Sequence, residues 1–151
     1  MTKQPQTDTK PLDDAFLHSC MYFTTNRLSR AITRMADEAF ATTGLAPAYG
    51  YLIRLVVGKP GIAQKELSEK LYITPSTLTR FIDKLEAKQL VERQVQGKTV
   101  LVYPTNKGKE LVPSLREASL KLKATYEAIL GKELADQLTH DHEIASEQLE
   151  R

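Results

Sequence analysis

Apolar residues recur every three or four positions along most of the chain, which is the spacing of one face of an α-helix. Over residues 12–41 this spacing predicts one long helix, and Gly44 suits the left-handed cap that would end it. A second helix is predicted from Ala46 and Pro47 to Val57, because proline is favoured in a first helical turn. Glycine and proline at residues 58–61 then break the helical pattern.

Two shorter helices are predicted after this break. One covers residues 64–71, a tight turn covers residues 72–73, and the other helix runs from Thr74 to about residue 88. Thr74 has the hydroxyl of an N-cap, and Pro75 fits the first helical position, where its missing N–H costs nothing. The apolar residues of the second helix form one stripe, at Leu78, Phe81, Ile82 and Leu85. Two helices joined by a short turn are typical of a helix-turn-helix.

The opposite face of the second helix is polar. Its first turn carries the small hydroxyl residues Ser76, Thr77 and Thr79, and Arg80 and Lys84 follow. Small hydroxyl side chains let a helix approach a phosphate or base edge closely, and an arginine can donate two hydrogen bonds to guanine or phosphate. The same face also suits a helix that is merely exposed to water, so this helix alone does not decide for DNA.

A β-hairpin is predicted next. Residues 90–95 and 99–103 are rich in β-branched and aromatic side chains, and Gly97 lies in the short segment that joins them. A hairpin after a helix-turn-helix forms a winged helix, in which Arg93 and Lys98 would place positive charge near the base and tip of the wing. The alternative is a hairpin that only closes a small core.

The last third of the chain is predicted to be helical. Apolar residues have helical spacing over residues 106–130 and 132–149, with a break at Gly131, and Pro113 bends the first of these helices or lies near its first turns. The apolar stripes of the first and last helices are too extensive for a small winged lobe to cover. A second copy of the chain would cover them, whereas the alternative is a monomeric helical cap.

Charge separates along the chain. Residues 59–109 hold ten Lys or Arg and five Asp or Glu, a net +5, whereas the remainder holds eleven and fourteen, a net −3. A basic middle favours a polyanion-binding module, although charge also fluctuates along any sequence. The composition is that of a globular protein without a membrane span or signal peptide, which predicts a cytoplasmic location and no membrane partner. Residues 1–11 are predicted to be a disordered tail.

Chemistry other than binding is weakly represented. The three histidines and one cysteine do not form a metal-ligand pattern, and no nucleophile–base pair stands out. We therefore expect no metal, no cofactor and no enzymatic activity. Cys20 is expected to be a buried structural residue, because nothing adjacent in the sequence would activate its thiol.

Five segments together resemble the MarR family of bacterial regulators. They are residues 62–71, 74–86 and 90–93, then residues 104–111 at the start of the helix after the wing, and residues 44–49 at the start of the second helix. The resemblance implies a single domain over residues 12–151 that is mainly α with a small hairpin wing. Residues 46–104 would form the winged helix-turn-helix lobe, on an intertwined dimerisation scaffold from residues 12–45 and 105–151.

The resemblance also implies a function and its sites. The chain would bind a pseudo-palindromic DNA operator as a homodimer, and a small molecule or oxidant would release this repressor. The implied DNA contacts are Gln64, Lys65, Thr74, Ser76, Thr77, Thr79, Arg80, Lys84, Arg93 and Lys98. The effector pocket, between the dimer helices and the lobe, would include Phe23, Arg27, Tyr49 and Arg54. The alternative is a winged-helix dimer for protein contacts or ligand binding, with a vestigial DNA face.

The chain departs from the family pattern at four places. The wing tip, residues 96–98, is short and lacks the usual Asp-x-Arg, so Lys98 is expected to contact phosphate at most. Gln89 replaces a common glycine, which predicts strain if the backbone there has a positive φ. Ala63 stands where a Ser or Thr cap is usual. Cys20 lies about two residues before the family's peroxide-sensing position, to which Tyr22 is nearer.

Overall fold

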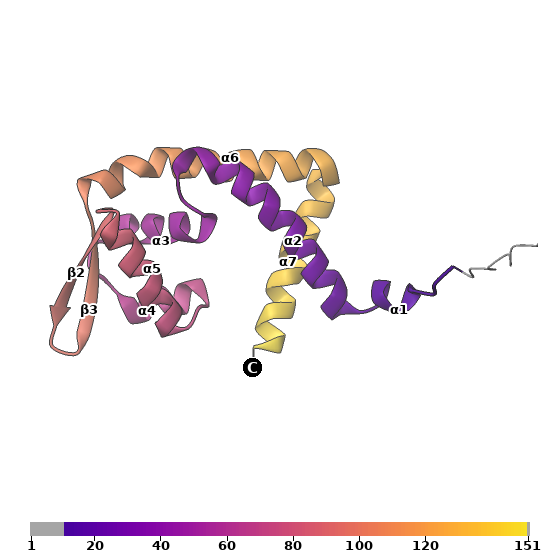
Figure 1. The fold of residues 1–151 in the computed structure, drawn as a ribbon, viewed down its shortest axis with the longest axis horizontal. Coiled ribbons are helices and arrows are strands. Elements are labelled where there is room, and N and C mark those ends of the chain that lie inside the picture. Colours follow the sequence, from indigo (N-terminus) through magenta and orange to yellow (C-terminus); the bar gives the residue numbers. More distant parts are fainter. Residues whose placement is uncertain (1–10, 151) are drawn as a thin grey trace, which may run out of the picture. The chain divides into compact units, whose positions relative to one another are not determined.

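The computed structural model describes residues 11–150, in which eight helical segments and three short strands follow one another (Figure 1). In chain order they are α1 (Ala15–His18), α2 (Met21–Phe40), η1 (Ala41–Thr43), α3 (Pro47–Gly58), β1 (Ile62–Ala63), α4 (Gln64–Leu71), α5 (Pro75–Ala87), β2 (Val91–Gln96), β3 (Thr99–Pro104), α6 (Asn106–Leu130) and α7 (Lys132–Leu149). This confirms the predicted mainly α fold with a hairpin wing. The predicted tail over residues 1–11 lies, apart from Pro11, outside the described residues.

The chain divides between Arg34 and Met35 into two compact units, and α2 passes through the boundary. In the first unit, the prediction of one unbroken helix over residues 12–41 is wrong, because α1 ends at His18 and α2 begins at Met21. The hydroxyl of Ser19 donates to the carbonyls of residues 15 and 16, at 3.4 and 3.3 Å. Such local side-chain bonds compete with continued helix.

Cys20 lies in this interruption and is exposed, so the expectation of a buried cysteine is also wrong. Its carbonyl oxygen accepts from the backbone N–H of Thr24 at 3.0 Å and from the Thr24 hydroxyl at 3.1 Å. The Cys20 carbonyl thus accepts the first backbone hydrogen bond of α2, while the Cys20 side chain lies at the surface.

The second unit contains the hydrophobic core. The apolar stripe predicted for α5 is confirmed, since Leu78, Ile82 and Leu85 are buried and Phe81 packs at the edge. These side chains meet apolar residues from the other elements, chiefly Phe40, Leu52, Ile53, Val56, Ile62, Leu67, Val91, Val102 and Leu115. The core therefore fixes α5 against α3, α4, the sheet and α6.

The helix limits of this unit agree closely with the sequence. The predicted helices over residues 64–71, 106–130 and 132–149 have those bounds, and α3 extends one residue past the predicted Val57. Pro113 lies inside α6. No single helix among the described residues is long and apolar enough to cross a membrane. One bent pair, Met21–Thr43 with α3, reaches the required length and apolar composition only when the two segments are taken together.

The sheet has one strand more than predicted. β2 and β3 form the expected antiparallel hairpin, closed at Gly97 with φ 62°, while Ile62 and Ala63 of β1 pair with Val102 and Leu101 on the other side of β3. A strand of two residues has no periodicity that a sequence could reveal, and it exists only because β3 provides the partner. β1 fixes the start of α4 to the base of the wing.

Two of the sequence departures, Gln89 and Ala63, are seen in the backbone of the winged lobe. Gln89 has φ 61°, so it adopts the left-handed conformation that favours glycine, as expected. α4 begins at Ala63 without a side-chain cap, also as expected. At the base of the wing the Thr105 hydroxyl donates to the Gln89 carbonyl at 2.7 Å and accepts from the Gly108 N–H at 3.0 Å. These bonds hold the two ends of the hairpin together.

Gly108 allows the first turn of α6 to sit directly on this junction. A β-carbon at residue 108 would lie 2.2 Å from the carbonyl oxygen of Leu90, which no side chain tolerates. Thr105 and Gly108 therefore have separate roles. Thr105 caps α6, and Gly108 lets the helix approach the carbonyl of Leu90 closely.

Candidate nucleic-acid interface

The hydrogen bonds of the turn between α4 and α5 fix the residue at which α5 begins. Tyr72 ends α4 in the left-handed conformation, with φ 54°, and its N–H donates to the Glu69 carbonyl at 3.4 Å. The N–H of Ile73 donates to the Ser68 carbonyl at 3.2 Å. Thr74 then caps α5 as predicted, because its side-chain oxygen accepts from the N–H of Thr77 at 3.3 Å.

A cluster of hydroxyl groups covers the first turn of α5. The Thr74 hydroxyl lies 3.2 Å from that of Ser76 and donates to that of Thr77 at 2.9 Å. Arg80 reaches the same cluster, with its Nη2 3.5 Å from the Thr77 hydroxyl. Arg80 is exposed, and within residues 11–150 it takes part in no ion pair. The N-terminus of α5 thus presents one uncompensated cation among small polar groups.

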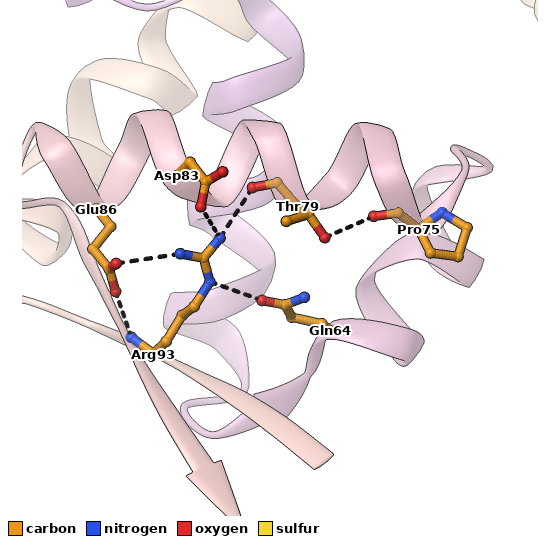
Figure 2. Close-up of polar contacts among 6 residues, drawn as sticks. All are labelled: Gln64, Pro75, Thr79, Asp83, Glu86 and Arg93. Carbon is orange, nitrogen blue, oxygen red and sulfur yellow. Dashed lines mark hydrogen bonds and ion pairs between the residues drawn. The ribbon is translucent and has the colours of Figure 1, made fainter. Parts of the chain in front are cut away.

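Arg93, in contrast, is held within the lobe (Figure 2). Its Nε donates to the Gln64 side-chain oxygen at 3.0 Å, and its Nη2 donates to the Thr79 carbonyl at 3.0 Å and to the Asp83 carboxylate. Its Nη1 donates to Glu86 Oε1 at 3.2 Å, and its backbone N–H donates to Glu86 Oε2 at 3.0 Å. One side chain from β2 therefore joins the wing to both helices of the helix-turn-helix.

This geometry changes the role expected of two predicted residues. Arg93 was predicted to contact DNA, but its guanidinium already faces four partners and its side chain is only 20% exposed. The side-chain oxygen of Gln64 likewise accepts a hydrogen bond from Arg93. We therefore assign both to positioning the interface. Asp83 and Glu86, which sequence reasoning did not select, are the acids that anchor Arg93, and their spacing of three residues on one helix face was the available signal.

Lys84 is directed toward the lobe. Its Nζ lies 5.0 Å from the centre of the Tyr49 ring, a cation–π distance, and the Tyr49 ring lies 4.6 Å from that of Phe81. This contact ties the middle of α5 to the start of α3. Lys84 is exposed, and its amine forms no ion pair within residues 11–150.

A cleft of about 670 Å³ separates the wing from the two helices. Lys65 at the start of α4 and Lys98 at the wing tip both line it, together with Thr79 of α5. No Asp or Glu is among its lining residues. The cleft is therefore electropositive and lies between the two elements that a winged helix sets against a duplex.

Comparisons with known proteins show which family part of this chain resembles. The MarR family signature matches residues 52–96, from α3 to the end of β2. The chain is 31% identical over 93 residues to the uncharacterized HTH-type transcriptional regulator YybA of Bacillus subtilis (strain 168), which covers 59% of this chain and 61% of that protein. Residues 52–96 of this chain are therefore similar to the MarR family.

The fold of this chain is also that of solved regulators. The transcriptional repressor CouR bound to a 23-mer DNA duplex superposes with a TM-score of 0.81, at 18% identity, over 91% of this chain and 99% of that one. CouR from Rhodococcus jostii RHA1 bound to p-coumaroyl-CoA gives 0.70, at 19% identity, over 83% and 90%. The chain spans about three fifths of the length of its B. subtilis relative. Both of these proteins are named as regulators of transcription.

The four residues predicted for an effector pocket lie in different places. Phe23 and Arg27 belong to α2 in the first unit, where the Phe23 ring makes an edge contact with His18 at 6.0 Å. Tyr49 and Arg54 belong to α3 in the second unit, where Tyr49 packs against α5 and Arg54 lines a cleft with residues of α4 and α6. A pocket formed by all four remains a prediction.

Proposed function

We propose that this chain is a sequence-specific DNA-binding regulator of transcription, which binds a pseudo-palindromic operator as a homodimer. One observation carries the proposal: α5 presents Arg80, which has no ion pair within residues 11–150, beside the hydroxyl of Thr77, while Lys65 and Lys98 line a cleft next to α5. With α5 in the major groove, Arg80 would read a guanine edge or grip a phosphate. Lys65 and Lys98 would contact the flanking backbone.

The wing contributes less to this interface than a longer wing would. Lys98 is the one cation in the tip at residues 96–98, and the other basic residue of the hairpin, Arg93, is committed to α4 and α5. The main readout therefore falls to Thr74, Ser76, Thr77, Thr79, Arg80 and Lys84 of α5 and its cap. The wing then serves as a phosphate clamp and not as a reader of the minor groove.

Exposed apolar side chains support the homodimer. Within the second unit, Leu120 and Ile129 of α6 are 68% and 71% exposed, and Leu134 and Ile144 of α7 are both 47% exposed. Large apolar side chains gathered on two consecutive helices mark an interaction surface, and a second copy offers the complementary one. Two lobes related by a twofold axis would meet two half-sites of one operator.

Regulation by a small molecule or oxidant is part of the proposal. The superposed CouR is a repressor bound to DNA in one structure and to p-coumaroyl-CoA in another, which supports a repressor that a ligand releases. The effector of this chain would act by changing how the two lobes present α5 to the operator.

Selection of bound duplexes from a random library tests the proposal. The selected duplex is expected to bind the full chain with an affinity that falls steeply with salt, and Arg80→Ala should cost about 1–3 kcal/mol per half-site. Lys109→Ala, an exposed cation on α6 that does not line the cleft of Lys65 and Lys98, is the matched control and should change affinity little. Affinity weaker than about 10⁻⁶ M for every duplex at moderate salt would favour the alternative of a protein- or ligand-binding dimer.

A further inference from the structure

Tyr72, in the turn between α4 and α5, is exposed although the residues on either side of it are anchored. Leu71 and Ile73 pack against the hydrophobic core, whereas the Tyr72 side chain is 76% exposed. No other aromatic side chain in the described part of the second unit is as exposed, and the next, Tyr51, reaches 40%. The fold therefore holds this ring in water and gains no core packing from it.

The backbone of Tyr72 is also unfavourable. Its φ of 54° lies in the left-handed region, which glycine adopts without strain and tyrosine does not. Within residues 11–150 Gln89 is the one other residue besides glycine with a positive φ. A glycine at residue 72 would form the same turn with less strain, so the turn itself does not require the tyrosine. A strained residue that the fold does not need indicates a role in binding.

The position of Tyr72 indicates what its side chain meets. Tyr72 precedes Thr74, the cap of α5, by two residues, so at most about 7.6 Å separates their α-carbons. The hydroxyl cluster and Arg80 follow in the first turns of α5. When the start of the second helix of a helix-turn-helix enters the major groove, the turn before it lies beside the sugar–phosphate backbone. Tyr72 therefore lies at the edge of the proposed DNA interface.

We propose that Tyr72 is a further DNA contact, whose phenolic hydroxyl donates to a backbone phosphate at the edge of the major groove while its ring covers the adjacent deoxyribose. Tyrosine is one of the side chains that bind DNA phosphates, and a hydrogen bond to a charged oxygen is stronger than one to a neutral oxygen. The N–H groups of Tyr72 and Ile73 donate to α4 carbonyls, so the backbone that carries the ring is fixed before DNA arrives. This inference rests on the proposed function, because it adds a contact to the same interface.

A contact of this kind differs from the other contacts of the interface in two measurable ways. A phosphate contact reads no sequence, so its loss weakens binding to the selected duplex and to an unrelated duplex by a similar factor, unlike the loss of a base contact by Arg80. A neutral hydroxyl releases no condensed cation from the DNA, so its loss leaves the salt slope unchanged, unlike the loss of Lys98.

The first test is Tyr72→Phe in the full chain, because phenylalanine keeps the ring and removes only the hydroxyl. We expect binding to the selected and unrelated duplexes to weaken by about tenfold, with the same salt slope as the parent. A methylphosphonate, which removes the charge of one phosphate, is then placed at each backbone position of the selected duplex in turn. At one position in each half-site it should weaken the parent more than the Tyr72→Phe variant. Equal affinity of the parent and the variant, or no such position, would overturn the proposal.

The second test compares Tyr72→Gly with Gln89→Gly. Both substitutions relieve a left-handed residue, so both should raise the urea midpoint measured at one fixed chain concentration. Only Tyr72→Gly should weaken DNA binding, by at least about tenfold. Gln89 follows the C-terminal end of α5, at the opposite end of the helix from the hydroxyl cluster, so Gln89→Gly should change DNA affinity less than about twofold. A stabilised Tyr72→Gly chain that binds DNA as the parent does would overturn the proposal and assign the exposed ring to a protein partner.

The two tests separate this inference from the proposed function. If the parent binds every duplex more weakly than about 10⁻⁶ M at moderate salt, the proposed function fails and the role of Tyr72 fails with it. If the parent binds its selected duplex tightly and both Tyr72 variants bind it equally well, only the role of Tyr72 fails.

Discussion

Replacement of Arg93 by methionine separates a residue that contacts DNA from one that positions the interface. Methionine keeps most of the apolar stem and removes the guanidinium, which makes two hydrogen bonds to neutral oxygens and pairs with two carboxylates. Asp83 and Glu86 are 59% and 43% exposed, so each ion pair contributes only about 0.5 kcal/mol. The bonds to Gln64 and the Thr79 carbonyl contribute about 1 kcal/mol each.

The sum is about 3 kcal/mol, which corresponds to a fall in Tm of roughly 6–12 °C for a chain of this size. Thermal unfolding followed by circular dichroism at one fixed chain concentration measures it, because the stability of a dimer depends on concentration. Met in place of Arg93 also leaves two carboxylates uncompensated on α5, close to where phosphates would lie. The affinity for the selected duplex should therefore fall as well.

Two results distinguish the mechanisms. If Arg93 acts by holding and neutralising Asp83 and Glu86, then Asp83→Asn with Glu86→Gln should restore most of the DNA affinity in the Arg93→Met background. Lys98→Met is the contrasting variant, because loss of a direct phosphate contact should lower the salt slope by about 0.9 per subunit and resist that rescue. A similar loss of slope in Arg93→Met, with no rescue by the two neutralising substitutions, would refute the positioning role.

Three further predictions follow from the junctions around the winged lobe. Gln89→Gly should raise the free energy of unfolding by about 1 kcal/mol, because glycine accepts φ 61° without strain, whereas Lys88→Gly next to it should lower the free energy; urea unfolding compares the two. Gly108→Ala should lower the same quantity by about 3 kcal/mol or more, since a β-carbon there would lie 2.2 Å from a carbonyl oxygen, and an unchanged urea midpoint would contradict this close approach. The Lys59 ammonium, which hydrogen-bonds Glu66, holds the pKa of that carboxyl below its ordinary 4.5, so the pair stabilises the fold above that pH and loses its effect as the pH falls through the lower folded-state pKa. The stability difference between the parent and Glu66→Gln should accordingly be present at neutral pH and vanish in acid, and a difference that grows in acid would contradict it.

Much of the fold could be predicted from the sequence because its elements are locally encoded. The stripe of Leu78, Ile82 and Leu85 has helical period, Thr74 with Pro75 marks a helix start, and Gly97 marks a hairpin turn. The strain at Gln89 was also predictable, since it follows from one residue type in one backbone position. These features depend on neighbours within a few residues, where sequence spacing and spatial contact coincide.

Contacts between distant segments were decided only by the tertiary structure. β1 exists because β3 lies beside it, and Arg93 meets Gln64, Thr79, Asp83 and Glu86 only after α4, α5 and the hairpin have packed around one core. The sequence identified Arg93 as a basic residue on a wing, which favours phosphate, but the charge of a side chain does not say which acids it will face. Charge and hydrophobic period are properties of the chain, whereas the partner of a charge depends on how the lobe packs. Here the partners Gln64, Thr79, Asp83 and Glu86 support our proposal that Arg93 positions the interface.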